Sequence, residues 1–191
     1  NRIVFPYLDA DGRTVFFNAR AAANVDGPEK FRKPAGAAQN VAFLRHALPD
    51  DCRYVILVEG EVDALSVLAT LGPDAPVLAA GGGKVEARLL EDLLPQLDQI
   101  LLLYDADEAG KRFARDAHAA LKDFKGDVST LTLPADCKDA NDVLSRYGVD
   151  LLREHLQREV AAARRTNDAA YIRTTFLEEL QRRHERPHVA F

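Results

Sequence analysis

The sequence predicts an α/β fold with a parallel sheet flanked by helices, and two observations support this prediction. Continuous apolar runs, which are typical of strands buried on both faces of a sheet, occur at residues 54–58, 77–80 and 100–104, and the mixed run at residues 128–133 is expected to form a fourth strand. A segment with the pattern of a helix follows each run after a short connection, at residues 61–71, 85–94, 108–122 and 141–147. Regular alternation of strands and helices favours parallel strands joined by right-handed crossovers.

The N-terminal region has a different pattern. Residues 3–8 and 14–18 are rich in β-branched and aromatic side chains, and the turn sequence Asp-Ala-Asp-Gly lies between them. This arrangement predicts a β-hairpin. The prolines and glycines of residues 21–36 indicate an irregular loop, and we expect a short helix at residues 37–47.

The chain is therefore expected to have three parts. Residues 1–48 form a small basic subdomain that contains the hairpin, and residues 49–148 form the sheet domain. Residues 149–191 form C-terminal helices, for which the amphipathic pattern predicts helical segments at 149–164 and 168–183.

Composition excludes several classes of protein. With 47% hydrophobic and 29% charged residues, the 191-residue chain is too apolar for a disordered segment. No apolar run approaches the ~18 residues that span a bilayer, so no membrane association is expected. Cys52 and Cys137 lack the spacing of a zinc site or a disulfide framework, which favours a reducing, cytoplasmic setting. The chain has no methionine and begins at Asn1, so we expect it to be a piece of a longer protein.

Charge is unevenly distributed along the chain. Residues 46–150 carry ten basic and twenty acidic side chains, whereas residues 1–45 and 151–191 are both net basic. The total of −5 is not typical of a nucleic-acid-binding protein. Either the acidic centre is a solvated surface, or its carboxylates await divalent cations while the basic flanks hold phosphates.

Acidic or glycine residues follow all four predicted strands of the parallel sheet. They are Glu59, the glycines 81–83, the pair Asp105 and Asp107, and the group Asp136, Asp139 and Asp142. Ligands bind beyond the carboxyl ends of such strands. Any one of these residues could instead cap a helix or relax a loop. However, Asp-Ala-Asp supplies two acids where one cap is needed, and extended residues two apart point the same way. Oxygen ligands without His or Cys suit Mg²⁺ or Mn²⁺.

Two motifs resemble the signatures of the Toprim domain, which primases, topoisomerases and small nucleases share. The first is Val-Glu-Gly-Glu-Val-Asp-Ala-Leu-Ser at residues 58–66, and the second is Tyr-Asp-Ala-Asp-Glu-Ala-Gly at residues 104–110. Residues 133–142, Leu-Pro-Ala-Asp-Cys-Lys-Asp-Ala-Asn-Asp, are similar to the third acidic motif of phage-type primase-helicases. Asn141 stands where bacterial replicative primases usually have a carboxylate.

The N-terminal region resembles the small basic subdomain that precedes Toprim in bacterial-type primases. The resemblance is carried by residues 6–13, by Asn18-Ala19-Arg20, and by Pro28-Glu29-Lys30-Phe31. Arg20 and Lys30 match family residues that face nucleotide and template phosphates, and Arg32 and Lys33 are their neighbours. Phe31 replaces the family's usual tyrosine, and the resemblance covers residues 3–147.

The resemblance implies metal-dependent nucleotidyl transfer that makes RNA primers on single-stranded DNA from ribonucleoside triphosphates. Two cations, Mg²⁺ or Mn²⁺, would be needed. Asp105, Asp107 and Asp139 are the expected ligands, and Glu59 is either a ligand or the group that handles the 3′-hydroxyl proton. Asp63, one helical turn beyond Glu59, and Asn141 would support the ligands from behind.

Further partners follow from the same resemblance. Arg20 and Lys30, with their neighbours Arg32 and Lys33, would hold phosphates. Lys84, which follows the three glycines, either reaches a phosphate or lies on an exposed surface. We expect a replicative helicase as a partner, either as a separate protein or fused in a longer chain. We expect the protein to act in the cytoplasm of a bacterial or phage-infected cell.

Other functions use the same motifs. A Toprim nuclease would apply the same carboxylates with water as the nucleophile, although the basic hairpin argues against it. A non-catalytic Toprim module would only bind DNA or recruit a helicase, with residues 149–183 as the contact. A topoisomerase would need a nucleophilic tyrosine from another domain.

Overall fold

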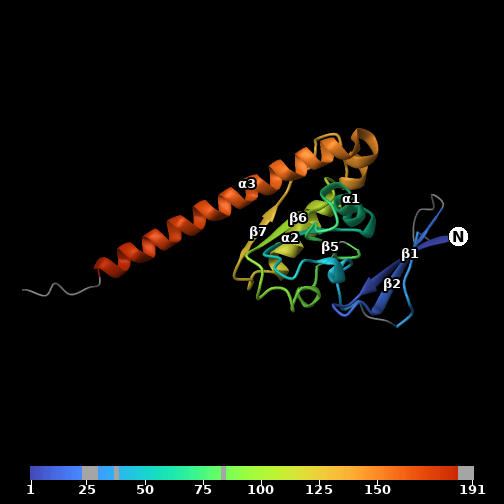
Figure 1. Ribbon diagram of the computed structural model, residues 1–191, viewed down its shortest axis with the longest axis horizontal. Helices are drawn as coiled ribbons and strands as arrows, with labels where there is room; N and C mark the ends of the chain where they lie inside the picture. Colours follow the sequence, from blue (N-terminus) through green and yellow to red (C-terminus); the bar gives the residue numbers. More distant parts are fainter. Residues whose placement is uncertain (23–29, 37–38, 83–84, 185–191) are drawn as a thin grey trace, which may run out of the picture.

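Four parallel strands form the main sheet of the protein. The computed structural model describes residues 1–22, 30–36, 39–82 and 85–184, and for residues 167–184 it describes the course of the helix alone. The strand order is β5–β4–β6–β7, with bounds β4 Tyr54–Val58, β5 Val77–Ala79, β6 Gln99–Leu103 and β7 Asp127–Thr130. Helices flank this sheet (Figure 1), so the predicted α/β fold is confirmed.

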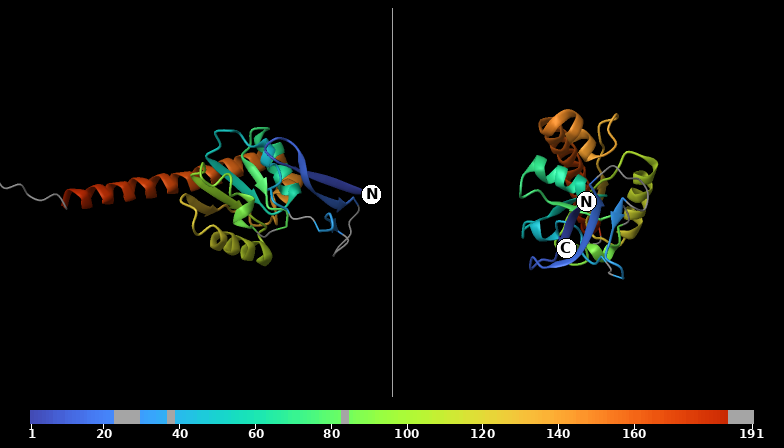
Figure 2. Two further views of the ribbon diagram at one scale, coloured as in Figure 1. Left: turned by 90° about the horizontal axis from the view of Figure 1, so that it is seen from below. Right: turned by 90° about the vertical axis from the view of Figure 1, so that its right-hand side faces the viewer.

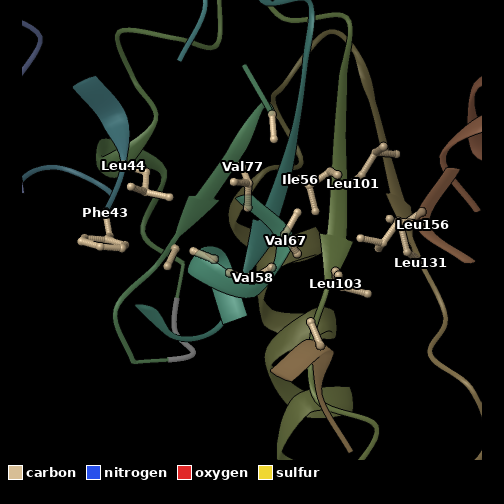
Figure 3. Close-up of a cluster of buried hydrophobic side chains, with 14 of the residues drawn as sticks. Phe43, Leu44, Ile56, Val58, Val67, Val77, Leu101, Leu103, Leu131 and Leu156 are labelled. Atoms are coloured by element: carbon tan, nitrogen blue, oxygen red, sulfur yellow. The ribbon is translucent and has the colours of Figure 1, made fainter. Parts of the chain in front are cut away.

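The two faces of the sheet carry separate layers of the core. Alternate side chains of a strand point to opposite faces, and the central strands β4 and β6 are buried on both. Helices α1 (Glu61–Leu71) and α3 (Ala140–His184) cover one face, and α2 (Glu108–Ala120) covers the other (Figure 2). Figure 3 shows the first layer, in which Ile56, Leu101 and Val67 of β4, β6 and α1 belong to one buried cluster.

A second, antiparallel sheet precedes the main one. Strands β1 (Arg2–Leu8) and β2 (Thr14–Ala21) form the predicted hairpin, and the short strand β3 (Phe31–Arg32) pairs with β2. The Asp9 carboxylate accepts hydrogen bonds of 3.0 Å from the backbone N–H groups of Asp11 and Arg13, which is an Asx-type turn. Aromatic side chains of the hairpin enter the first core layer, where the Tyr7 and Phe43 rings lie 5.3 Å apart.

The prediction of a helix at residues 37–47 is wrong for the part of this segment that the structure describes. Only the 3₁₀ turn Arg45–Ala47 is helical. Phe43 instead pairs with Ala79 as an antiparallel bridge, with N···O distances of 2.9 and 3.2 Å. Burial of Phe43 against the hairpin, together with these backbone bonds at the edge of β5, overrides the local helical pattern.

The helix expected at residues 85–94 is reduced to the 3₁₀ turn Ala87–Leu89. Three-residue turns continue the segment, since the N–H of Leu93 donates to the Leu90 carbonyl over 2.8 Å. Leu89, Leu90 and Leu93 are all buried in the second core layer. A regular helix of this length is replaced by turns that bury these leucines together.

The C-terminal helices are fewer and longer than the sequence predicts. The helix expected at 141–147 is present, and Gly148, with φ of 84°, separates it from the next one. The break expected near residue 166 is absent, and the helix continues to His184 as a long extension from the body of the protein (Figure 1). The Thr166 hydroxyl donates to the Ala162 carbonyl over 3.1 Å, a bond that lets threonine stay within a helix.

In the described part of the chain, no helix has both the length and the apolar character that crossing a membrane requires. The expected boundaries of the three parts, at residues 48 and 148, stay predictions.

The layered core predicts a sharp contrast between two leucines. Leu101 is fully buried in the central strand β6, whereas Leu65 is exposed on α1. Leu101→Ala should lower the free energy of unfolding by about 2–5 kcal/mol because it leaves a cavity. The matched control Leu65→Ala should change it by less than about 0.5 kcal/mol. Urea unfolding measures both, and equal losses would contradict the assignment of β6 to the centre of the core.

Candidate active site

Four of the acidic residues predicted from sequence, Glu59, Asp63, Asp105 and Asp139, meet in one pocket at the carboxyl edge of the main sheet, whereas Asp107 lies outside the pocket lining. Glu59 directly follows β4, Asp105 lies two residues beyond β6, and Asp139 directly precedes α3. The pocket has a volume of about 220 Å³. Its lining consists of Arg20, Lys30, Phe31, Glu59, Gly60, Glu61, Val62, Asp63, Asp105, Lys138, Asp139 and Asn141. Residues from both sheets therefore enclose it.

Lys138 bridges the two acids of the Asp-Ala-Asp motif. Its ammonium nitrogen lies 3.2 Å from Asp105 Oδ2 and 3.4 Å from Asp107 Oδ2. The Lys138 carbonyl also accepts a 2.7 Å hydrogen bond from the N–H of Ala106. These contacts attach the third acidic motif to the second. Sequence reasoning missed Lys138, although it was visible as the one cation inside the motif at residues 133–142.

Burial, together with the charges of neighbouring acids, raises the pKa values of several carboxyl groups at the pocket. Burial, reinforced by the charges of Asp105 and Asp107, raises the pKa of Glu59 to about 7. Burial and the charge of Asp139 raise the pKa of Asp63 to about 7. Burial also raises the pKa of Asp105, although Lys138 opposes this shift. Such mutual destabilisation of charged forms is typical of functional sites.

Two of the acids also cap helices. Asp107 Oδ1 accepts a 2.9 Å hydrogen bond from the N–H of Gly110 at the start of α2, and this bond lowers the pKa of Asp107. Asp139 Oδ1 accepts a 2.7 Å bond from the N–H of Asp142 in the first turn of α3. The capping interpretation of these residues is thus correct for both, and each cap engages only one carboxylate oxygen.

Asp63 and Asn141 lie side by side in the wall of the pocket. The backbone N–H of Asn141 donates to Asp63 Oδ1 over 3.2 Å, and the Ser66 hydroxyl donates to Asn141 Oδ1 over 3.4 Å. These bonds join α1 to the start of α3. The first and third motifs are therefore fixed relative to each other.

Only some of the predicted phosphate-binding residues lie at the acidic pocket. Arg20 and Lys30 line the acidic pocket. Arg32 pairs in register with Ala19, the neighbour of Arg20, so it lies on the opposite face of the small sheet. The Lys33 ammonium donates to the Gly81 carbonyl over 3.0 Å and lines a neighbouring pocket with Gly81 and Gly82. Lys84 lies outside the described residues.

Two further acids of the third motif lie outside the pocket lining. Asp136 forms an ion pair of 3.1 Å with Arg146. Asp142 accepts a 3.1 Å hydrogen bond from the backbone N–H of Lys138. Both side chains thus stabilise the loop that carries Lys138 and Asp139.

Glu61 is a second residue that sequence reasoning missed. Its side chain is 3% exposed, and Oε1 accepts hydrogen bonds from the Tyr7 hydroxyl and the Asn18 amide. The available signal was the second acid of Glu-Gly-Glu, since one glutamate suffices for the motif's first position.

The donor set suits a hard divalent cation in kind, because it consists of carboxylate oxygens. Within the residues that the structure describes, no three Asp, Glu, His or Cys side chains lie close enough together to hold a metal ion. The Lys138 ammonium stands between Asp105 and Asp107. The positive charge of Lys138 thus offsets part of the negative charge of Asp105 and Asp107, the two acids predicted from sequence to bind metal.

Comparisons with known proteins agree with the geometry. Residues 56–144 match the model of the Toprim-like family, which confirms the resemblance inferred from the motifs. The chain is 30% identical over 143 residues to the DNA helicase/primase of Enterobacteria phage T3, covering 73% of this chain and 24% of that protein. It is 26% identical over 166 residues to the DNA primase of Haemophilus influenzae, covering 82% of this chain and 27% of that protein.

A solved structure extends the comparison to the fold. The primase fragment of the bacteriophage T7 primase-helicase protein superposes with a TM-score of 0.65 and 26% identity, covering 80% of this chain and 60% of that fragment. The chain spans about a quarter of the length of the two curated relatives.

The raised pKa of Glu59 predicts how stability varies with pH in protein free of divalent cations. The folded state binds a proton that the unfolded chain has lost between the ordinary carboxyl pKa of 4.5 and the shifted value of about 7. The free energy of unfolding should therefore fall as pH rises through this window. Urea unfolding with a chelator, at several pH values, measures it.

Glu59→Gln is the matched control for this prediction. It keeps the size of the side chain and removes the titrating group, so the fall with pH should be smaller. Titrating groups that do not interact with Glu59 cancel in the difference between the two proteins, whereas the pKa of Asp63, which the charge of Glu59 raises, should also fall in the variant. Identical pH profiles would contradict the assigned environment of Glu59.

Proposed function

We propose that this chain, whose residues 56–144 form a Toprim-like domain, is the catalytic part of a DNA primase. The observation that carries the proposal is the pocket in which Arg20 and Lys30 of the small sheet meet Glu59 and Asp105 of the main sheet. Primer synthesis needs carboxylates at the reacting 3′-hydroxyl and cations at the triphosphate. Similarity to a DNA primase and to a DNA helicase/primase supports this function.

The acidic edge would perform the metal-dependent part of nucleotidyl transfer. Asp105, Asp107 and Asp139 would hold two Mg²⁺ or Mn²⁺ ions after moving closer together than in the present arrangement, in which no three described acids are close enough to hold one. Asp107 and Asp139 each have an oxygen outside their caps for this purpose. The ions, when bound, supply positive charge to the attacking and leaving oxygens. Glu59 either completes the ligand set or accepts the proton of the 3′-hydroxyl, and its pKa of about 7 suits proton exchange near neutral pH.

Lys138 would keep the acidic edge balanced until substrate arrives. Its ammonium holds Asp105 and Asp107 together over 3.2 and 3.4 Å. Its side chain is more than half exposed, so it is free to turn toward solvent. An incoming triphosphate is a suitable partner for the displaced ammonium.

The basic residues would hold the polyanionic substrates. Arg20 and Lys30, within the pocket, would contact the triphosphate or the template. Arg32, Lys33 and Lys84 would serve phosphates farther along the strand, with Lys33 placed beside Gly81 and Gly82. The whole protein would use single-stranded DNA, ribonucleoside triphosphates and a replicative helicase, in the cytoplasm of a bacterial or phage-infected cell.

We extend the proposal to the organisation of the chain. Residues 1–48 would be the basic subdomain of the primase core, residues 49–148 the Toprim domain, and residues 149–191 a helical extension.

Asp107→Asn provides the direct test of catalysis. Asparagine caps helices as well as aspartate does, so α2 should be retained while the negative charge is lost. Template-dependent incorporation of labelled ribonucleotide, with Mg²⁺ or Mn²⁺, should fall by at least ~100-fold. Asp116→Asn, at an exposed position of the same helix, should leave incorporation unchanged.

The same assay separates primase from nuclease. Loss of full-length labelled single strand without incorporation would favour a Toprim nuclease. Binding of DNA without either reaction would favour the non-catalytic module. Near-normal incorporation by Asp107→Asn would contradict the assigned site.

Neutralising Arg20 and Lys30 tests the basic side of the pocket. The double variant Arg20→Ala/Lys30→Ala should weaken binding of single-stranded DNA and reduce the salt slope by ~0.7 for each phosphate that the protein no longer neutralises. Mn²⁺ binding should survive, because the carboxylates are untouched. Arg13→Ala, at the exposed hairpin turn, is the control, and an unchanged salt slope in the double variant would contradict the role.

A further inference from the structure

Glu61 connects the two sheets through buried hydrogen bonds. It is the first residue of α1 and lies two residues after Glu59. Its Oε1 accepts a 2.7 Å bond from the Tyr7 hydroxyl and a 2.8 Å bond from the Asn18 side-chain amide. Tyr7 lies in β1 and Asn18 in β2, so one carboxylate oxygen binds both strands of the hairpin.

The burial of Glu61 requires compensation, since a buried carboxylate is destabilising unless it is well hydrogen-bonded. Two features offset the desolvation of Glu61. Both donors point at the same oxygen, and the positive end of the α1 dipole lies at this first helical position. The negative charge and the burial together raise the pKa of Tyr7 above its ordinary value, so the hydroxyl stays protonated as a donor.

The small sheet transmits this anchor to the basic residues. Asn18 and Arg20 are two residues apart in β2 and therefore lie on the same face. The N–H of Ala21 donates to the Lys30 carbonyl over 2.8 Å, which ties Lys30 to the end of β2. Fixing Asn18 thus fixes the backbone that carries Arg20 and Lys30, and both side chains line the pocket together with Glu61.

Gly81 provides the space in which the anchor is built. A Cβ atom at Gly81 would overlap the Tyr7 hydroxyl oxygen, and its φ of +75° favours glycine independently. The N–H groups of Gly81 and Gly82 donate to the Glu59 carbonyl over 3.1 and 3.3 Å. The glycines after β5 therefore hold Glu59 by its backbone and leave room for Tyr7.

We propose that Glu61 is a positioning residue that orients the hairpin through Tyr7 and Asn18, so that Arg20 and Lys30 face the carboxylates across the pocket. The inference rests on the proposed function, because it assigns Arg20 and Lys30 to phosphate. Packing of the Tyr7 ring against Phe16 and Phe43 keeps the sheets associated without the hydrogen bonds. Loss of the anchor should therefore change orientation more than folding.

Tyr7→Phe tests this role, because it removes the hydroxyl and keeps the ring. Its affinity for fluorescently labelled ATP should fall by up to about tenfold, because Arg20 and Lys30 are then held less firmly toward the pocket and the effect is bounded by the loss of one hydrogen bond to a charged group. In the Arg20→Ala/Lys30→Ala background, the same substitution should change affinity less than about twofold. Tyr54→Phe, in the main sheet outside the pocket, should not change affinity in either background.

Hydrogen exchange provides a second readout that is independent of nucleotide. Amides of β2 should exchange faster in Tyr7→Phe and in Glu61→Gln, whereas amides of β4 and β6 should be unchanged at temperatures well below unfolding. This measurement keeps the test decisive where a variant is less stable overall.

The outcomes are distinguishable. An equal loss of affinity in both backgrounds, or unchanged affinity and exchange in Tyr7→Phe, would overturn the positioning role while the proposed function stands. Equal binding of ATP by the wild type and by Arg20→Ala/Lys30→Ala would overturn the phosphate role, and the positioning role with it.

Discussion

Convergence of like charges at one edge of a buried sheet is the constraint on which the rest of the structure depends. The strands β4 and β6 are largely apolar and buried, and Glu59 and Asp105 follow their carboxyl ends into the same pocket. Burial, reinforced by the charges of neighbouring acids, raises the pKa values of Glu59 and Asp63 to about 7. Lys138 and the backbone N–H groups at the helix starts offset part of the negative charge, and a divalent cation would offset more. Burial of these acids is therefore unfavourable for stability, which is consistent with the proposed role in binding a cation.

The orientation of the small sheet relative to the main sheet needs a second kind of contact, because aromatic packing alone does not fix the angle between a hairpin and the main sheet. Apolar contacts are non-directional, whereas the hydrogen bonds of Tyr7 and Asn18 to Glu61 are directional. Placing this anchor two residues from Glu59 couples the orientation of the basic face to the acidic edge itself. Gly81, after β5, leaves room for the Tyr7 hydroxyl of the same anchor. This packing requirement accounts for a glycine at this position without any contact to phosphate.

The parts of the structure that sequence could predict are those in which local pattern and burial agree. β4 and α1 have the predicted bounds, since an apolar run ending in Glu-Gly allows few alternatives. The segments at 37–47 and 85–94 failed because Phe43 and the buried leucines form non-local contacts that a helical pattern does not report. Lys138 and Glu61 were missed for the same reason. A lysine within a loop and a glutamate at a helix start have ordinary solvated roles, and only their partners 31–54 residues away distinguish them.

The sequence left open whether the acids of the Asp-Ala-Asp motif cap a helix or bind a metal ion. The two roles are compatible. A cap occupies one carboxylate oxygen and fixes the side-chain rotamer, and a fixed rotamer is what a metal ligand needs. Asp107 and Asp139 both cap with Oδ1, at helices that begin where two of the motifs end. Asp105, more buried and held by Lys138, has the raised pKa that an uncapped acid acquires in this setting. The helix starts therefore fix the side chains of the acidic edge, and the observed structural role and the proposed catalytic role fall on the same residues.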